Sequence, residues 1–371
     1  MIDLGLSEEQ ETVREVARQI GLDVLYPAAR DAERARAVPE NVWQTIFDSG
    51  LTTPVAEAFG GGGIFDTVTQ CVAAEALAYG DPGIALAALW NGTAALIVGL
   101  SGSAEQQQRL LPKLATDPHA RSAVALYEGF GRAPTEFQTT IAATGDSWRL
   151  SGKKVAVPLS ASADHLVVVI GAEAGSGRLA AALVETSTPG LVISPDERHI
   201  ALDAVPTSTI TFNVTVPRTD ILIAADAGQA VETAVSRVRL LLAAASVGCA
   251  QRAMEYASQY ALDRVAFDKP IAAFQGISFL LADASMRIQA ARLAMYHAAS
   301  NIDRGLPSEN DVSNAVNYAG VAATQATRDS LQVLGGHGFI TDHPVELWYR
   351  SAAALSAIDF DPLLSAYEPA L

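Results

Sequence analysis

The stretch from Arg239 to Asp283, RLLLAAASVGCAQRAMEYASQYALDRVAFDKPIAAFQGISFLLAD, decides the fold. It begins as a long apolar segment, turns at Asp268-Lys269-Pro270, and continues into a second segment with helical spacing. An apolar stripe recurs there at steps of four and three, formed by Ile277, Leu281, Ala284, Ile288, Ala291 and Met295. Because proline has no N–H for a helix interior, we expect Pro270 at the start of the second helix. The pattern predicts an antiparallel helix pair in a bundle.

Small side chains in the first segment predict that another helix lies close to it. Ala243, Ala244, Ala245 and Gly248 carry little or no side chain. Two helices can approach closely where such residues meet. We therefore expect a neighbouring helix to pack against this stretch.

Length and charge limit the classes of function. The chain has 371 residues, which exceeds the roughly 250–300 residues that one core usually serves, so two or three domains are expected. Half of the residues are hydrophobic. The net charge of −16 argues against binding to nucleic acid or to an anionic membrane surface. An anionic ligand would therefore need local Arg, Lys or backbone N–H groups.

Several other features point to a cytoplasmic protein without a metal. Cys71 and Cys249 lie in apolar helical contexts, which favours buried thiols in a reducing cytoplasm. We expect no signal peptide, since no basic segment precedes an apolar one at the N-terminus. The apolar run 83–100 is interrupted by Asn91-Gly92 and is short for a membrane span. The six His residues are scattered without metal-ligand spacing, so no metal site is expected.

The pattern divides the chain into three predicted domains, 1–118, 119–222 and 223–371. The first reads as helical, with Ser7 and Ser103 as N-caps and a helix over Pro39–Ser49. The second contains short strands, for which we expect Val167–Ile170, Leu179–Val184 and Thr209–Val216, and a hairpin turn at Gly145-Asp146. The third is helical again, with helices expected at about 227–263, 271–304, 308–334 and 345–368.

Several segments, in order along the chain, resemble the acyl-CoA dehydrogenase family. Arg264, Phe267, Phe274 and Gln275 are spaced as in the helix–turn–helix signature of that family. Further matching segments are EAFGGGG at 57–63, GSAEQ at 102–106, QVLGGHGF at 332–339 and PVE at 344–346 followed by Arg350. The resemblance implies a mainly α fold with a central β domain: an N-terminal helical domain, a middle β-barrel and a C-terminal four-helix bundle that builds a dimer of dimers.

The resemblance also implies which residues bind FAD across a subunit interface. In the family, residues at the positions of Arg264 and Phe267 reach the pyrophosphate end of FAD held mainly by a neighbouring subunit. Gln332 and Gly336 match the positions that contact the adenine half. Ile271 and Phe274 complete this set of cofactor-binding candidates. All six match the family pattern.

The residues expected to contact a subunit's own FAD differ from the family pattern. Tyr127 replaces a hydroxyl residue that contacts the flavin ring, and Ala133 replaces a serine near the phosphates. A Trp–Ile/Val–Thr segment that packs on the ring reads Ala156-Val157-Pro158, and Asp361 replaces a threonine. Pro158 cannot donate a backbone hydrogen bond. Tyr127 and Pro158 remain candidate contacts, and Arg132 could reach a phosphate or lie in solvent.

The expected catalytic base is Asp359. The family usually places a Glu nine residues after the position of Arg350, and Asp359 stands there with one methylene less. The nitroalkane oxidases, which share the fold, use an Asp at this position. The alternative base position of the family, one residue before Arg239, is Val238. Asp359 could equally be a solvated turn residue, and Arg239 is a candidate for substrate binding.

The resemblance implies FAD-dependent α,β-dehydrogenation of an acyl-CoA, with an electron-transfer flavoprotein or a similar acceptor. A carboxylate would remove the α-proton, and the flavin would take the hydride from the β-carbon. The chain could be a self-sufficient enzyme in a homotetramer. It could instead be a flavin-poor, inactive partner in an α₂β₂ heterotetramer that completes the FAD site of another chain. A flavin oxidase or monooxygenase that uses Asp359 is a third reading.

Overall fold

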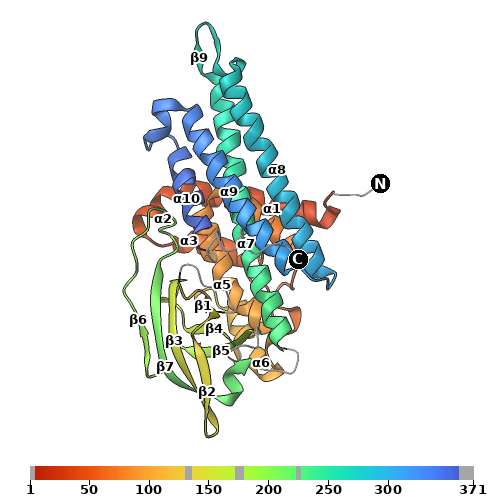
Figure 1. Cartoon of the computed structure of the whole chain (residues 1–371), viewed down its shortest axis with the longest axis vertical. Helices are drawn as coiled ribbons and strands as arrows, with labels where there is room; N and C mark the ends of the chain where they lie inside the picture. The colour runs from red at the N-terminus through yellow and green to blue at the C-terminus, as the bar shows by residue number, and fades with distance from the viewer. Residues whose placement is uncertain (1–4, 130–135, 172–178, 223–226, 359–371) are drawn as a thin grey trace.

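The computed structural model describes residues 5–129, 136–171, 179–222 and 227–358. Helices build the first part, two sheets build the middle and long helices build the last part (Figure 1). The expected fold class, mainly α with a central β domain, is confirmed.

The N-terminal part consists of helices packed around one apolar core. Their bounds are α1 (Glu8–Ile20), η1 (Gly21–Leu25), α2 (Tyr26–Ala35), α3 (Glu40–Asp48), η2 (Glu57–Phe59), α4 (Thr67–Gly80), α5 (Pro82–Ser101) and α6 (Ala104–Thr116). Ser7 and Ser103 each form a capping box with the Gln three residues later, as predicted. The helix expected at 39–49 is α3.

The middle part forms two four-stranded sheets that share a core. One has the order β1-β4-β5-β8 and the other β2-β3-β7-β6. Their bounds are β1 (Ser122–Ala125), β2 (Thr140–Thr144), β3 (Ser147–Pro158), β4 (His165–Gly171), β5 (Leu179–Glu185), β6 (Leu191–Ile193), β7 (Thr207–Pro217) and β8 (Ile221–Leu222), with the turn η4 (Arg218–Asp220) before β8. The predicted hairpin turn at Gly145-Asp146 joins β2 to β3.

The C-terminal part is the predicted bundle. It contains α7 (Ala227–Asp263), β9 (Val265–Ala266), β10 (Lys269–Pro270), η5 (Ile271–Ala273), α8 (Gln275–Asp303), α9 (Glu309–Val333), η6 (Gly335–Phe339) and α10 (Val345–Ser356). The close helix approach expected at Gly248 is also present, because a Cβ there would lie 2.1 Å from the Glu75 carbonyl oxygen of α4.

The prediction for Pro270 was wrong. Pro270 lies in β10 and is followed by the short η5, so α8 begins only at Gln275. In the hairpin Pro270 stands opposite Val265, and the 3-10 turn then carries the chain into the helix. A proline suits an edge strand of this kind as well as it suits a helix start.

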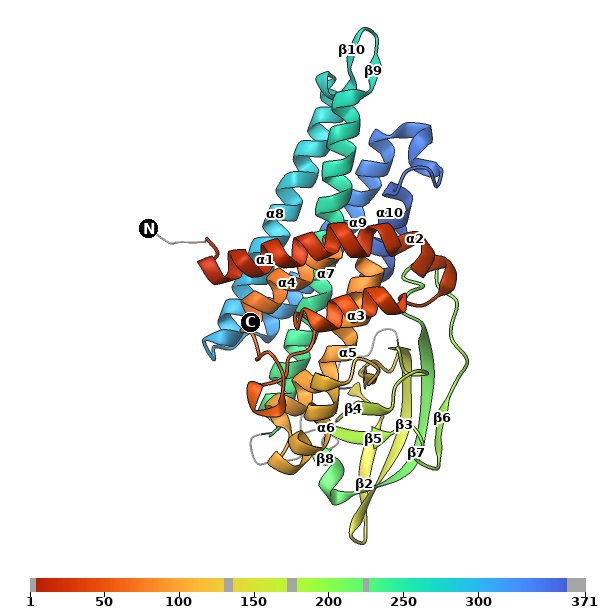
Figure 2. The same ribbon diagram turned by 180° about the vertical axis from the view of Figure 1, so that it is seen from behind.

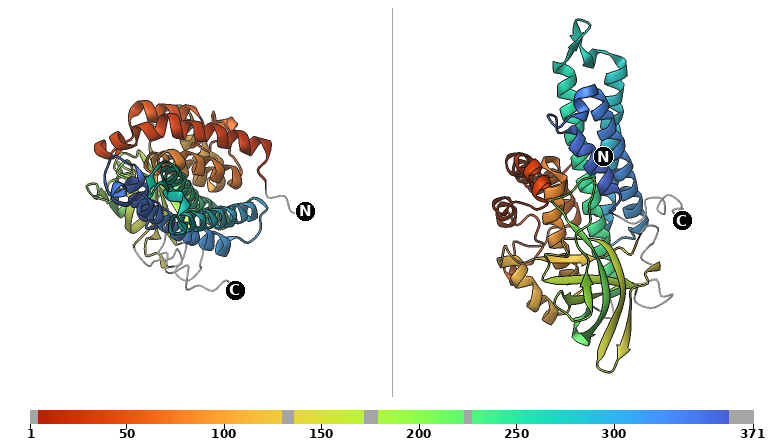
Figure 3. Two further views of the ribbon diagram at one scale, coloured as in Figure 1. Left: turned by 90° about the horizontal axis from the view of Figure 1, so that it is seen from above. Right: turned by 90° about the vertical axis from the view of Figure 1, so that its left-hand side faces the viewer.

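The long axis of the molecule runs along the bundle. The hairpin β9–β10 lies at one end of this axis, and the sheets lie in the other half (Figure 1). From behind, α1 crosses α4 and the bundle (Figure 2). The views from above and from the side place α1 to α3 on one side of the bundle (Figure 3). The N-terminal helices thus support the bundle without covering its hairpin end.

Two helices have the length and hydropathy of a membrane span. The segments are Pro82–Ser101 and Gln229–Asp263, and 83% and 94% of their most apolar windows are buried inside the protein. Core helices of this size show the same composition, since they contact other helices on every side.

Candidate functional site

The hairpin that follows α7 exposes an aromatic side chain. Phe267 and Asp268 form its two-residue loop, and both have positive φ, 52° and 63°. Phe267 is 89% exposed, and its ring lies edge-on to Phe274 with centroids 6.2 Å apart. Loops of this kind favour Asn-Gly, so Phe267 adopts a costly conformation without gaining burial. Strain of this kind is a feature of functional sites.

A groove of about 590 Å³ lies at the base of this hairpin. Its lining joins the end of α7, the start of η5 and the turn after α9, and it includes Tyr260, Arg264, Ile271, Gly335, Gly336 and His337. We call it the tip groove. The structure thus brings together Arg264, Ile271 and Gly336, which the sequence predicted as cofactor contacts from segments some seventy positions apart. Gln332 is exposed on the last turn of α9.

Arg264 is available to a ligand in the tip groove. Its backbone N–H donates to the Tyr260 carbonyl and its carbonyl accepts from Ile271 N. Its guanidinium makes no ion pair or hydrogen bond with any residue that the structure describes. An exposed, unpaired guanidinium offers planar donors that match a phosphate or carboxylate.

A cluster of two tyrosines and two histidines, which was not predicted from the sequence, lies at and beside the tip groove. Tyr260 OH lies 3.2 Å from His337 Nδ1, and Tyr256 OH lies 2.8 Å from His343 Nδ1. Burial raises the pKa of Tyr256. The two tyrosines stand four residues apart on α7, so they share a face of that helix. This spacing was the only sequence signal for the cluster.

The candidate contacts in the middle domain, Tyr127 and Pro158, are both buried. The Tyr127 carbonyl accepts a hydrogen bond from Val155 N of β3 at 2.9 Å. Pro158 ends β3, after a bulge between Lys154 and Val157. Ala156 lies in this bulge with φ 47°, a strained value for a residue with a Cβ.

An apolar cavity of about 270 Å³ lies beside this bulge, between the sheet and α10. Its lining includes Ala156, Ile200, Leu202, Val205, Ala354, Ala357 and Ile358, with His199 and Thr207 as polar residues. We call it the bulge cavity. Alanine at 156, 354 and 357 leaves this space open, whereas larger side chains at these positions would fill it. The cavity adjoins Ile358, and Asp359, the predicted base, lies outside the described residues.

Arg350 holds α10 in place at the bulge cavity. Its guanidinium pairs with Glu33 of α2 at 2.7 Å and Glu346 of α10 at 2.8 Å, and it donates to the Ile200 carbonyl at 2.7 Å. Burial lowers the pKa of Arg350, but the two carboxylates raise it overall. In the sequence, Arg350 serves only as the position from which Asp359 is counted. In the structure it joins three parts of the chain.

Arg239, the candidate for substrate binding, is buried within the bundle. It is 8% exposed, and its Nη1 donates to Ser313 Oγ of α9 at 3.1 Å. Its role in substrate binding stays a prediction. The sequence candidate Arg132 and the altered positions Ala133 and Asp361 lie outside the described residues.

The tip groove and the middle domain are far apart within one chain. Glu232, near the start of α7, accepts a hydrogen bond from Leu179 N of β5. Arg264 follows the end of α7, about 48 Å further along the helix axis at 1.5 Å per residue. The hairpin and the sheets accordingly lie in opposite halves of the molecule (Figure 1). One dinucleotide would not span this distance, so the two sets of predicted contacts of one chain cannot hold the same FAD molecule.

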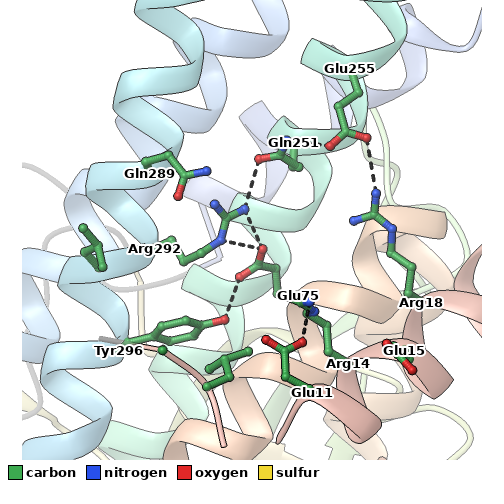
Figure 4. A pocket seen from close by; sticks show the side chains of 13 residues that line it. Glu11, Arg14, Glu15, Arg18, Glu75, Gln251, Glu255, Gln289, Arg292 and Tyr296 are labelled. Atoms are coloured by element: carbon green, nitrogen blue, oxygen red, sulfur yellow. Dashed lines mark hydrogen bonds and ion pairs between the residues drawn. The ribbon is translucent and has the colours of Figure 1, made fainter. Parts of the chain in front are cut away.

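A third recess, of about 620 Å³, lies between α1 and the bundle (Figure 4). Arg292 of α8 pairs with Glu75 at 2.7 Å and donates to Gln251, and Tyr296 donates to Glu75. The other two arginines of the recess pair with Glu11 and Glu255. All three of its arginines are therefore neutralised by carboxylates, unlike Arg264.

We also find no cluster of three metal-ligating side chains in the described part of the chain.

Comparison with known proteins identifies the family. Models of the N-terminal, middle and C-terminal domains of acyl-CoA dehydrogenase match residues 7–118, 122–215 and 227–359. The chain belongs to the acyl-CoA dehydrogenase family. A probable acyl-CoA dehydrogenase of Mycobacterium tuberculosis is 31% identical over 357 residues, which cover 94% of this chain and 90% of the relative. An acyl-CoA dehydrogenase of Bacillus subtilis is 31% identical over 355 residues, covering 94% and 93%.

Solved structures of the family superpose on nearly the whole chain. The butyryl-CoA dehydrogenase of Megasphaera elsdenii has a TM-score of 0.87 at 25% identity and covers 98% of both chains. A glutaryl-CoA dehydrogenase in complex with glutaryl-CoA has a TM-score of 0.87 at 26% identity, covering 98% of this chain and 95% of its own. The similarity to acyl-CoA dehydrogenases thus includes the hairpin, the bundle and the middle domain.

Proposed function

We propose that this chain acts in the FAD-dependent α,β-dehydrogenation of an acyl-CoA thioester. Its tip groove would bind the adenine and pyrophosphate part of an FAD molecule held mainly by a second subunit. The observation that carries the proposal is the exposed Arg264 guanidinium, which pairs with none of the described residues and lines one groove with Gly336. In a chain of net charge −16, this local cation suits an anionic ligand.

The described residues of the tip groove fit such a cofactor. Arg264 can donate to phosphate oxygens, and Gly336 carries no side chain to block a close approach. Phe267 can be covered by the second subunit. In the middle domain, the bulge cavity offers apolar walls for a ring, with few polar groups beside His199 and Thr207.

The reaction divides between cofactor and protein. FAD, when bound, supplies the acceptor for the hydride that leaves the β-carbon. Asp359 is our candidate for the group that takes the α-proton. Arg350 fixes α10, and through it the position of Ile358, from which the chain continues to Asp359. Asp is shorter than the usual Glu, and a misplacement of about 1 Å costs on the order of a hundredfold in rate.

Two forms of this function remain open. In the first, the chain completes the FAD site of a different, catalytic subunit in an α₂β₂ assembly and is inactive alone. The altered residues Tyr127 and Pro158 support this form. In the second, the chain is a self-sufficient homotetrameric enzyme, which the bulge cavity next to Ile358 supports. A flavin oxidase using Asp359 is a further alternative, and release of peroxide in air would favour it.

The names of relatives suggest the partners. Butyryl-CoA and glutaryl-CoA dehydrogenases among the similar structures support an acyl-CoA thioester as substrate. Another similar structure, at 25% identity, is named for the electron transferring flavoprotein of Acidaminococcus fermentans. This name supports the proposal that an acceptor of this kind reoxidises the cofactor.

The visible absorption spectrum tests the proposal. We would purify the chain alone, then co-expressed with the most similar chain encoded beside it, and add an acyl-CoA without oxygen. Flavin absorbance in the chain alone, bleached by the acyl-CoA, would show the self-sufficient enzyme. Flavin absorbance only in the complex would show the completing subunit. A colourless protein in both preparations, not restored by added FAD, would contradict the proposal.

The variant Arg264→Ala tests the tip groove itself. Loss of charged hydrogen bonds worth about 1.5–3 kcal/mol should weaken FAD retention roughly 10- to 150-fold. Arg304→Ala is the matched control, because Arg304 is also exposed and follows the end of a bundle helix, α8. Equal FAD retention in both variants, measured by dialysis and absorbance, would remove Arg264 from the site.

A further inference from the structure

A buried ion pair in the middle domain is not explained by the fold alone. The side chains of Lys154 and Glu128 are 0% and 1% exposed. Lys154 Nζ donates to Glu128 Oε1 at 3.0 Å and to the Leu126 carbonyl at 2.9 Å. It also lies 3.7 Å from the centre of the Phe137 ring. An aliphatic pair would fill the same volume without the cost of removing two charges from water.

Glu128 joins two separate parts of the backbone. Its carboxylate accepts from Gln138 N at 2.5 Å and from Thr139 N at 2.9 Å. The chain that leaves β1 is therefore tied to the chain that enters β2. The carboxylate can remain charged there because Lys154 neutralises it.

Lys154 joins the same region to β3. Lys154 Nζ holds the Leu126 carbonyl, and the next residue, Val155, donates its N–H to the Tyr127 carbonyl. The β-bulge between Lys154 and Val157 comes next in the strand, and its residue Ala156 lines the bulge cavity. These contacts thus involve the residues directly before the two candidate segments of the middle domain, Tyr127 and Ala156–Pro158.

The charge states follow from this packing. Burial lowers the pKa of Lys154 to about 8, although Glu128 opposes the shift. Burial would raise the pKa of Glu128, but Lys154 and the N–H groups of Gln138 and Thr139 lower it overall. Above about pH 8 the lysine becomes neutral, and the Glu128 carboxylate loses its counter-charge.

We propose that Lys154 and Glu128 are positioning residues for a flavin in the middle domain of this same chain, because they tie the Leu126–Tyr127 backbone to β3 directly before Ala156, which lines the bulge cavity. The proposal rests on the proposed FAD chemistry and adds to it that this chain keeps the ring side of the site. The two residues act through the backbone of Leu126, Tyr127 and Val155.

The test compares a neutral pair with a matched surface variant. The double variant Lys154→Met/Glu128→Gln removes both charges and keeps the volume and one side-chain oxygen that accepts from the backbone N–H groups of Gln138 and Thr139, so it should fold. The control is Lys153→Met, which removes one charge from the adjacent, exposed position of β3. Both proteins are prepared as the wild type is, alone or in the complex, and circular dichroism checks their fold.

Two measurements separate positioning from stability. Hydrogen exchange at the Gln138, Thr139 and Val155 amides reports the backbone ties without any ligand. FAD titration by fluorescence quenching, from pH 7 to pH 9, reports the site. In the wild type and in Lys153→Met we expect FAD affinity to fall about tenfold as the pH passes 8. The double variant should bind FAD at least tenfold more weakly at pH 7, without that pH dependence.

The outcomes distinguish this inference from the proposed function. Equal FAD affinity in the folded double variant and the wild type would overturn the positioning role while leaving the FAD chemistry intact. Lower affinity with the same pH dependence as the wild type would also overturn it. A wild type that binds no FAD in any preparation would overturn the proposed function and this inference with it. A Lys153→Met protein that behaves like the double variant would show that the effect is not specific to the buried pair and refute the assignment.

Discussion

Replacing the hairpin loop Phe267-Asp268 by Asn-Gly should stabilise the folded chain and lower its affinity for FAD. Both loop residues have positive φ. This conformation costs a residue with a Cβ about 1–2 kcal/mol, whereas it costs glycine almost nothing and asparagine little. Side-chain contacts of Phe267 offset little of this cost, because the residue is 89% exposed and its ring contact is with Phe274.

The size of the effect follows from these contacts. The Asn-Gly loop should relieve about 2 kcal/mol of backbone strain and lose about 0.5–1 kcal/mol of aromatic contact. The net gain of about 1 kcal/mol should raise the melting temperature by about 2 °C in a chain of this size. If Phe267 is covered by a second subunit at the FAD site, its loss should cost about 2 kcal/mol of binding, or roughly 30-fold.

Two variants make the assay decisive. Asp268→Gly alone relieves part of the strain and keeps Phe267, so it should gain stability and retain FAD. Phe267→Asn/Asp268→Gly should gain more stability and lose FAD on dialysis. Urea unfolding of the flavin-free protein gives the first quantity, and flavin absorbance after dialysis gives the second. Equal FAD retention in the two variants would refute a role for Phe267, and lower stability in both would refute the strain argument.

Two further predictions concern the core. Gly248→Ala should cost about 2–3 kcal/mol, because its Cβ would meet the Glu75 carbonyl of α4, whereas Gly276→Ala in α8 has open space and should be neutral or stabilising in thermal melts. Burial raises the pKa of Asp81 to about 6, so its ionisation penalises the folded state above that pH and not below about pH 4. Asp81→Asn keeps the acceptor for Ile84 N and should be about 2–3 kcal/mol more stable than the wild type at pH 7, with no difference at pH 4 in urea melts.

The fold was largely predictable because its signals are local. A capping box occupies four residues, so Ser7 and Ser103 marked their helices correctly. Gly145-Asp146 marked its hairpin for the same reason. Pro270 was placed wrongly because its rule allows two positions, a helix start or an edge strand. The hairpin that decides between them depends on pairing with Val265.

The sites were less predictable because they depend on distant segments. The pattern around Arg264 and Gly336 pointed to one ligand through the family resemblance, but only the structure shows the two residues in one groove. The bulge cavity had no sequence signal, since its lining joins Ala156 of β3 with Ala354 of α10 and with Ala357, the residue after that helix. Lys154 was equally hidden, because a lysine in a strand ordinarily points to solvent.

The tip groove and the middle domain both depend on how the chain assembles with other subunits. In a symmetric homo-oligomer every chain offers both its tip groove and its middle domain, so each interface would complete two equivalent FAD sites. In that case the Lys154–Glu128 pair serves a ligand in every subunit. In a heteromer the tip groove of this chain would suffice, and the buried pair would contribute to folding alone. The number of FAD molecules per total chains of the assembly and the FAD affinity of the Lys154→Met/Glu128→Gln variant must therefore agree. One FAD for every chain of a homo-oligomer requires a sensitive pair, and one FAD for every two chains, this chain and its partner, requires an insensitive one.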